Sequence, residues 1–131
     1  LVGIDLNGSV TYADSEIREN EKDPTSVGKK LPRVPDWRAA AAVTWHQNEK
    51  LNYTLGARYS GRQYNTMNNT DFNHDTFGGV SKFFMVDARV NYTVSKRVTA
   101  SIGVDNLNND KAYVFHPYPQ RVFHAQLKYI Y

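Results

Sequence analysis

Apolar and polar residues alternate along most of this chain with a period of two. In the last segment, Phe123, Ala125 and Leu127 share one face, and most of the residues between them are polar. Such alternation is typical of a β-strand that separates an apolar environment from water. Five earlier segments repeat it. We therefore expect six strands, at residues 2–12, 37–47, 51–64, 83–94, 98–105 and 123–131.

The second expected strand contains four consecutive alanines, at residues 39–42, which a helix would also accommodate. The Val43-Thr44-Trp45 segment and the polar turn at residues 48–50 favour a β-hairpin instead. Within the strands, small apolar residues keep phase with large ones. We therefore expect four alanines on the apolar face of the sheet, which is the lipid-facing side if the sheet spans a membrane: Ala57, Ala88, Ala100 and Ala125.

The connections between the expected strands are long, short, long, short and long in turn. Bacterial outer-membrane barrels have short periplasmic turns and long extracellular loops. The pattern therefore predicts an all-β, antiparallel up-and-down meander in a transmembrane β-barrel, with the long loops outside the cell. Because the smallest single-chain barrels have eight strands, either this is part of a larger barrel or several copies close a ring together.

The composition agrees with a barrel and disfavours several other classes of protein. The 131 residues are 40% hydrophobic, but they contain no run near the roughly 18 apolar residues that a membrane helix needs. A mean hydropathy of −0.61 is compatible with a barrel because about half of its strand residues face water. The chain begins at Leu1 in mid-strand, so we expect it to be a piece of a longer protein.

The charged residues and the absence of cysteine limit the possible chemistry. Sixteen basic and 13 acidic residues are well mixed, and they form no basic stretch suited to nucleic acid. Without cysteine, disulfides, thiolate metal sites and cysteine nucleophiles are excluded. No Ser, His and Asp arrangement specifies a hydrolase. We therefore expect neither an enzyme nor a nucleic-acid partner, and we identify no cofactor.

Four sequence segments resemble the C-terminal end of a TonB-dependent outer-membrane receptor: Arg58–Thr66, Phe83–Arg89, Gly103–Asn109 and His116–Arg121. The aromatic last strand adds to the resemblance, although the family usually ends on Phe and this chain ends on Tyr131. The resemblance implies a 22-stranded barrel, of which residues 1–131 are a C-terminal part.

The same resemblance implies a function. Such receptors lie in the bacterial outer membrane and import a scarce nutrient, typically a ferric siderophore. An N-terminal plug domain, outside this sequence, would control passage, and the contact with TonB would also lie outside it. We expect the barrel wall to contact outer-membrane lipid.

Aromatic and basic residues of the long loops are candidates for ligand binding, since flat rings and cationic groups suit an anionic chelate. The alternative is that these rings pack the loops together or join the outer aromatic girdle. The predicted substrate-binding residues are Tyr64, Phe72, His74, Phe77, His116, Tyr118 and Arg121.

Two metal-binding interpretations have less support in the sequence than ligand binding by the loops. Asp71, Asn73 and Asp75 alternate like the first ligands of a calcium loop, but Thr76 and Lys82 stand where that loop needs Gly and Glu. A hydrated loop is the preferred interpretation. The histidines at positions 46, 74, 116 and 124 have no partner at a recognised ligand spacing, and His46 and His124 are expected to face the barrel lumen.

Five charged residues, Arg58, Arg62, Asp87, Arg89 and Asp105, are also expected on the lumen side. They can pair across strands or contact the plug. Two other interpretations of the whole chain remain open. One is a membrane barrel enzyme or an oligomeric, porin-like barrel, and the other is a soluble β-rich binding module whose sheets pack face to face.

Overall fold

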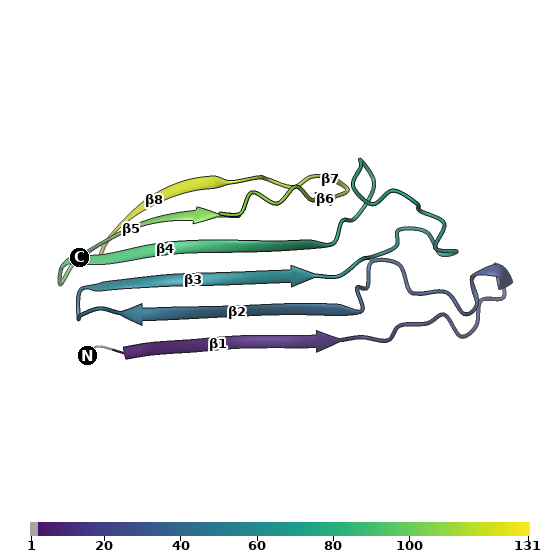
Figure 1. Cartoon of the computed structure of the whole chain (residues 1–131), viewed down its shortest axis with the longest axis horizontal. Coiled ribbons are helices and arrows are strands. Elements are labelled where there is room, and N and C mark those ends of the chain that lie inside the picture. Colours follow the sequence, from purple (N-terminus) through teal and green to yellow (C-terminus); the bar gives the residue numbers. More distant parts are fainter. Residues whose placement is uncertain (1–2) are drawn as a thin grey trace.

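The computed structural model describes residues 3–131, which form one six-stranded antiparallel sheet and a small two-stranded hairpin (Figure 1). Each strand of the large sheet lies beside the one that precedes it in that sheet along the chain, so the predicted meander is confirmed. The strands are β1 (Gly3–Tyr12), β2 (Trp37–His46), β3 (Leu51–Ser60), β4 (Phe83–Ser95), β5 (Val98–Asp105) and β8 (Val122–Tyr129).

The register aligns like residues across the whole sheet. One row of paired positions is apolar: Ile4, Trp45, Tyr53, Val90, Ile102 and Ala125. A neighbouring row is mostly polar: Asp5, Thr44, Thr54, Arg89, Gly103 and His124. Successive side chains of a strand point to opposite faces. The sheet therefore has one apolar and one polar face, as the alternation predicts.

The apolar face is not covered by a second layer of the described residues. Leu6, Ile102 and Phe123 remain 80%, 63% and 76% exposed, whereas a soluble domain would bury such a row against another element. The small hairpin, β6 (Tyr113–Val114) and β7 (His116–Pro117), does not pack on it. The sheet therefore does not have the face-to-face packing of a soluble sandwich.

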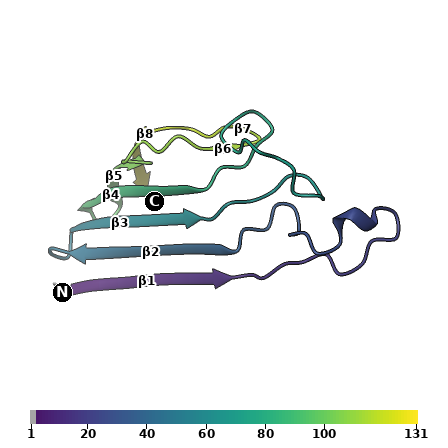
Figure 2. The same ribbon diagram turned by 45° about the vertical axis from the view of Figure 1, so that its right-hand side comes forward.

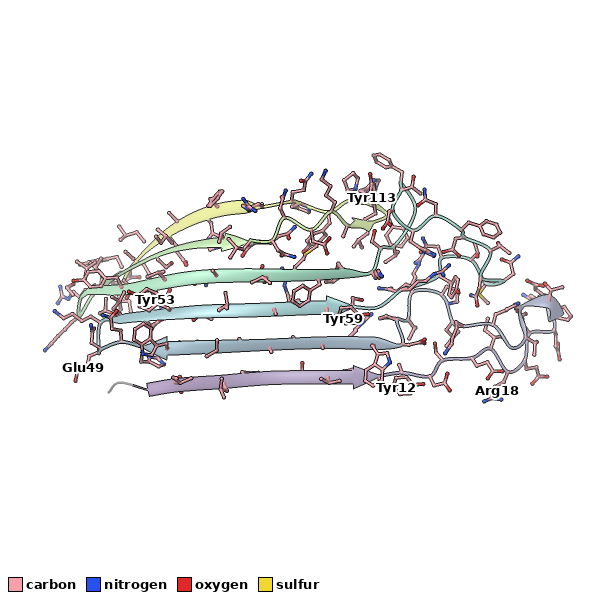
Figure 3. The ribbon with its side chains drawn as sticks, in the orientation of Figure 1. Tyr12, Arg18, Glu49, Tyr53, Tyr59 and Tyr113 are labelled. Atoms are coloured by element: carbon pink, nitrogen blue, oxygen red, sulfur yellow. The ribbon has the colours of Figure 1, made fainter. Side chains whose placement is uncertain are left out.

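The short and long connections lie at opposite ends of the strands. Figure 1 shows the two short turns, the start of β1 and the C-terminus at the left, and the three long loops at the right. We call these the first loop (residues 13–36), the second loop (61–82) and the third loop (106–121). In Figure 3, Glu49 marks a short turn, and Arg18 lies far out on the first loop.

The sheet is curved. Figure 2 shows β5 and β8 turning out of the plane of the other strands. The first and last strands, β1 and β8, each pair on one side only. A curved sheet with two open edges has the form of a barrel segment, since closure removes such edges.

Two strands end two or more residues earlier than the sequence predicts, and β2 ends one residue earlier, at His46 and not at Gln47. β3 ends at Ser60 and not at Tyr64, because the Tyr64 carbonyl accepts a hydrogen bond of 2.8 Å from Arg33 in the first loop. β8 ends at Tyr129 and not at Tyr131, because its pairing partner β5 begins opposite it, at Val98.

The loops contain short elements that the sequence reading did not predict. These are the hairpin β6–β7 and the 3-10 turn η1 (Pro24–Ser26), which the Asp23 side chain caps by accepting from the Thr25 amide. In residues 3–131 no helix is long and apolar enough to cross a bilayer.

Candidate functional site

The three long loops are joined to one another by hydrogen bonds, so they form one structure above the strand ends. Between the first two loops, the Asn69 side chain accepts from the Lys30 amide at 2.8 Å and donates to the Lys30 carbonyl at 3.0 Å. Between the second and third loops, Val80 bridges to Val114, and the Phe115 amide donates to the Gly79 carbonyl at 2.9 Å. Residues far apart in the sequence therefore meet here.

The first loop is closed at its base by ion pairs. The Lys30 ammonium lies 2.9 Å from an Asp14 carboxylate oxygen and 3.0 Å from one of Asp36. The hydrogen bond from Lys30 is the main cause that lowers the pKa of Asp14, and the same contact raises the pKa of Lys30. These groups are in contact with water, so the ion pairs orient the first loop but contribute little to its stability.

The second loop is organised around Asp71. Its carboxylate accepts hydrogen bonds from the amides of Asn65 and Thr66 and from the Thr66 hydroxyl. Burial raises the pKa of this carboxyl, but the hydrogen bonds outweigh that effect and the net pKa is lowered. The Asp71 carboxylate therefore stabilises its own loop by hydrogen bonds. In the described part of the chain, no three acidic or histidine side chains gather as a metal site.

The third loop is fastened to the sheet at its root. Arg58 donates two hydrogen bonds to Asp87, at 2.8 and 3.1 Å, and Asp87 also accepts from the Asn106 amide at 2.9 Å. Asn106 is 2% exposed and has a φ of 54°, a left-handed conformation that Asn tolerates. The predicted pairing of lumen-side charges across strands is present for Arg58 and Asp87.

Side chains of the Asp-Asn-Leu-Asn-Asn segment, residues 105–109, and of the following Asp110 form hydrogen bonds with the backbone of β4. The Asn108 side chain accepts from the Val86 amide and donates to the Phe84 carbonyl, and Asp110 accepts from the Phe84 amide. These groups replace the backbone partners that β4 lacks beyond the end of β5. Buried or half-buried backbone groups need such partners, so this segment has a structural role.

A cavity of about 570 Å³ lies on the polar face at the roots of the three loops. Three of its lining residues are arginines, Arg33, Arg38 and Arg58, and none is acidic. The Arg58 charge is matched by Asp87, whereas Arg33 and Arg38 make no ion pair among the described residues. Its lining consists of Ser9, Thr11, Arg33, Arg38, Ala39, Ala40, Arg58, Tyr59, Ser60, Gln63, Val80, Phe83, Val114 and Phe115. We call it the arginine cavity.

The predicted site residues fall into two aromatic groups. The Tyr64 and His74 rings meet edge to face with centroids 6.0 Å apart, and the Arg62 guanidinium lies 4.7 Å from the Tyr64 centroid. The Phe77 ring meets His116 at 6.0 Å and Tyr113 at 6.1 Å. Figure 3 shows Tyr113 at the loop end of the sheet.

The other predicted site residues are more separate. Phe72 is 93% exposed and makes no aromatic contact in the described residues. Arg121 donates through Nε to the Leu107 carbonyl at 3.0 Å, and Tyr118 lies beside the Arg58 guanidinium. The structure thus brings Tyr64 with His74 and Phe77 with His116, but it does not gather all seven predicted residues.

His74 is, with Tyr64, one of the two predicted site residues that are partly buried. Its side chain is 14% exposed, its ring nitrogens have no hydrogen-bond partner in the described residues, and Nδ1 lies 3.4 Å from Asp71. The sequence reading did not assign Arg33, Arg38 or Gln63 to a site. A signal for the first two existed in the sequence, because both are cationic residues next to an expected strand end at the side of the long loops.

Comparisons with known proteins all find receptors of a similar kind. A protein-family profile described as "TonB dependent receptor-like, beta-barrel" matches residues 2–107. A protein of Acinetobacter baumannii, "Probable TonB-dependent siderophore receptor PiuA", is 28% identical over 124 residues, which is 85% of this chain and 16% of that protein. This chain therefore spans less than a fifth of the length of that curated relative.

Two solved structures share the fold. The crystal structure of the siderophore receptor PiuA from Acinetobacter baumannii aligns with a TM-score of 0.73 at 23% identity, over 93% of this chain and 18% of that one. A ferric enterobactin receptor, PfeA from Pseudomonas aeruginosa, solved with enterobactin, aligns with a TM-score of 0.70 at 17% identity, over 97% of this chain and 20% of that one.

Proposed function

We propose, because this chain belongs to the TonB-dependent receptor-like β-barrel family, that residues 1–131 are a C-terminal part of a receptor that takes up ferric siderophores. Members of this family are bacterial outer-membrane β-barrel proteins. The six-stranded sheet is a segment of such a barrel, and 22 strands for the whole barrel is consistent with the family. The plug and the contact with TonB lie outside these residues.

In this proposal the apolar face contacts outer-membrane lipid and the polar face lines the lumen. The long loops are then extracellular, and the short turns are periplasmic. Figure 3 supports this placement of the strands across the membrane, since Tyr53 lies near the short-turn end of the sheet and Tyr12 and Tyr59 lie near the loop end. Tyrosine and tryptophan rings prefer the two membrane interfaces.

The observation that carries ligand capture is the arginine cavity, where three loops meet beside three arginines and no lining carboxylate. A low-dielectric cleft with one sign of charge attracts ligands of the opposite sign. The relatives named above are described as siderophore receptors and not as enzymes. A ferric siderophore with net negative charge is therefore the proposed ligand.

We propose that the two aromatic groups, Tyr64 with His74 and Phe77 with His116, form the outer wall of the binding site above this cavity. Phe72, Tyr118 and Arg121 complete the proposed contacts. Exposed rings such as Phe72 and Phe77 offer flat apolar surface for a large chelate. Packing between loops is the alternative role for all of them.

Uptake of radiolabelled iron by cells that express the complete receptor tests the proposal. We expect uptake of ferric enterobactin, used as the probe, to require both the receptor and the energised inner membrane. Uptake of cobalamin in place of any ferric chelate would overturn the ligand class while leaving the receptor class intact.

Variants of the complete receptor test the loop residues. We expect His116→Ala and Phe77→Ala to weaken binding of ferric enterobactin by about tenfold, as loss of a packed ring at a binding site does. Lys96→Ala, at the opposite end of the strands, is the control and should bind like the native receptor. If both loop variants also bind like the native receptor, the rings serve only to pack the loops.

A further inference from the structure

Two residues from different loops meet in the lining of the arginine cavity. Arg33 belongs to the first loop and Phe115 to the third, and both line the cavity. The Arg33 guanidinium carbon lies 4.9 Å from the centroid of the Phe115 ring. This distance is within the range of a cation–π interaction. The pair therefore connects two loops that are more than 80 positions apart in the sequence.

The backbone at both residues is held in an unfavourable conformation. Arg33 has a φ of 66° and Phe115 a φ of 64°, in the left-handed region that residues with large side chains rarely adopt. The second loop holds both. The Arg33 amide donates to Tyr64, and Phe115 exchanges hydrogen bonds with Gly78 and Gly79. Strained residues that the surrounding structure over-determines cluster at ligand clamps.

The pair leaves the charge of Arg33 available. Stacking uses the flat face of a guanidinium, while its N–H groups lie at the edge in a planar fork that can donate to an anion. No carboxylate lines the cavity, and Arg33 makes no ion pair in residues 3–131. Arg58 differs, because Asp87 occupies its fork.

We infer that Arg33 and Phe115 form a clasp across the mouth of the arginine cavity and determine its preference for anionic chelates. Phe115 fixes the plane of the Arg33 guanidinium, and the edge of that group binds an anionic oxygen of the ligand. Both side chains line the cavity, and Arg33 remains exposed to solvent, so a ligand can reach its guanidinium. This inference rests on the proposed function of the loops as the ligand-binding region.

Binding to the complete receptor in detergent tests the clasp, with ferric enterobactin as the anionic probe and the neutral chelate ferrichrome as the comparison. Arg33→Lys keeps the charge but removes the planar fork, and Phe115→Leu keeps apolar bulk but removes the ring face. The control is Arg18→Lys, an exposed arginine of the same first loop that pairs with Glu16 at 3.4 Å. Unaltered heat-modifiable mobility in gels shows that each variant is assembled.

We expect each clasp variant to weaken binding of the anionic chelate by about tenfold, with a change of less than about twofold for the neutral one. The double variant should lose little more than either single variant, since interacting residues are not additive. Arg18→Lys should bind both chelates normally.

Three results would overturn the clasp and leave the receptor function standing. These are additive losses in the double variant, equal weakening for both chelates, or native binding in the single variants. A native receptor that binds neither chelate would instead overturn the proposed function, and the clasp with it.

Discussion

Gly79 is the glycine of the second loop with the least room for a side chain. A methyl group there would lie 2.8 Å from the His74 carbonyl carbon and 3.0 Å from the Thr76 carbonyl oxygen. Both are backbone atoms, so the loop itself would have to move. The Gly79 carbonyl also accepts from the Phe115 amide, so any movement would reach the third loop.

We therefore expect Gly79→Ala to destabilise the loop assembly by about 1–3 kcal/mol, the usual cost of overpacking. Hydrogen exchange at the Phe115 amide in the complete receptor measures this, and it should become faster. Gly56→Ala is the control, since its nearest neighbour would be the Ala41 carbonyl oxygen at 3.7 Å. Equal exchange in both variants would show that the second loop adapts freely.

Asp71 gives the second loop a dependence on pH. Hydrogen bonds lower its pKa in the folded protein below the ordinary value of 3.8. Its contribution to stability is therefore complete above that value, and it is lost as the pH falls through the lowered folded pKa. We expect exchange at the Asn65 and Thr66 amides to accelerate in this acid range.

The matched variant is Asp71→Asn, which removes the titrating group and keeps its size. Its amides should exchange faster than the native ones at neutral pH and should lose the acid-dependent step. A step of the same size in this variant would assign the effect to another carboxyl group.

At the scale of a strand, the two faces of β8 differ in what they tolerate. Ala125 pairs with Ile102 in the apolar row, and the adjacent Gln126 pairs with Ser101 on the polar face. The two positions lie at nearly the same depth but point in opposite directions. In the proposed barrel, a charge at Ala125 would enter lipid, whereas a charge at Gln126 would remain in the hydrated lumen.

We expect Ala125→Arg to destabilise the assembled barrel by about 2–4 kcal/mol, and Gln126→Arg to have little effect. Denaturant unfolding of the complete receptor in lipid vesicles measures both. Because the variants differ by one position, strand propensity and depth are controlled. A larger loss at Gln126 would invert the assignment of the faces.

For the whole molecule, the arrangement of connections predicts the orientation of the proposed receptor in the membrane. All short turns lie at one end of the sheet and all long loops at the other (Figure 1). The exposed residues Lys22 and Lys111 belong to the long loops, and Glu49 and Lys96 to the short turns. These 131 residues contain no cysteine, so single cysteines can report on each end.

We expect cysteines placed at Lys22 and Lys111 to react with a membrane-impermeant reagent on intact cells. Cysteines at Glu49 and Lys96 should react only after the outer membrane is opened. Labelling at the short turns of intact cells would reverse the topology and would move the arginine cavity to the periplasmic side.

The sequence by itself determined the strands and their faces. A period of two is a local property, so the apolar row through Trp45, Tyr53 and Val90 follows from alternation once the strands pair in register. The long and short connections were also visible in the sequence, and the family resemblance is confirmed by the match over residues 2–107. The ends of β3 and β8 could not be predicted from the sequence, because they depend on where a neighbouring strand or loop offers a hydrogen-bond partner.

The tertiary structure alone decided how the loops meet. Pairing of Tyr64 with His74, and of Phe77 with His116, requires three loops to fold on one another through contacts distant in sequence. Arg33 and Phe115 adopt left-handed backbones that no local propensity predicts for such residues. The arginine cavity therefore appears only after the loops have closed, since each of its walls comes from a different part of the chain.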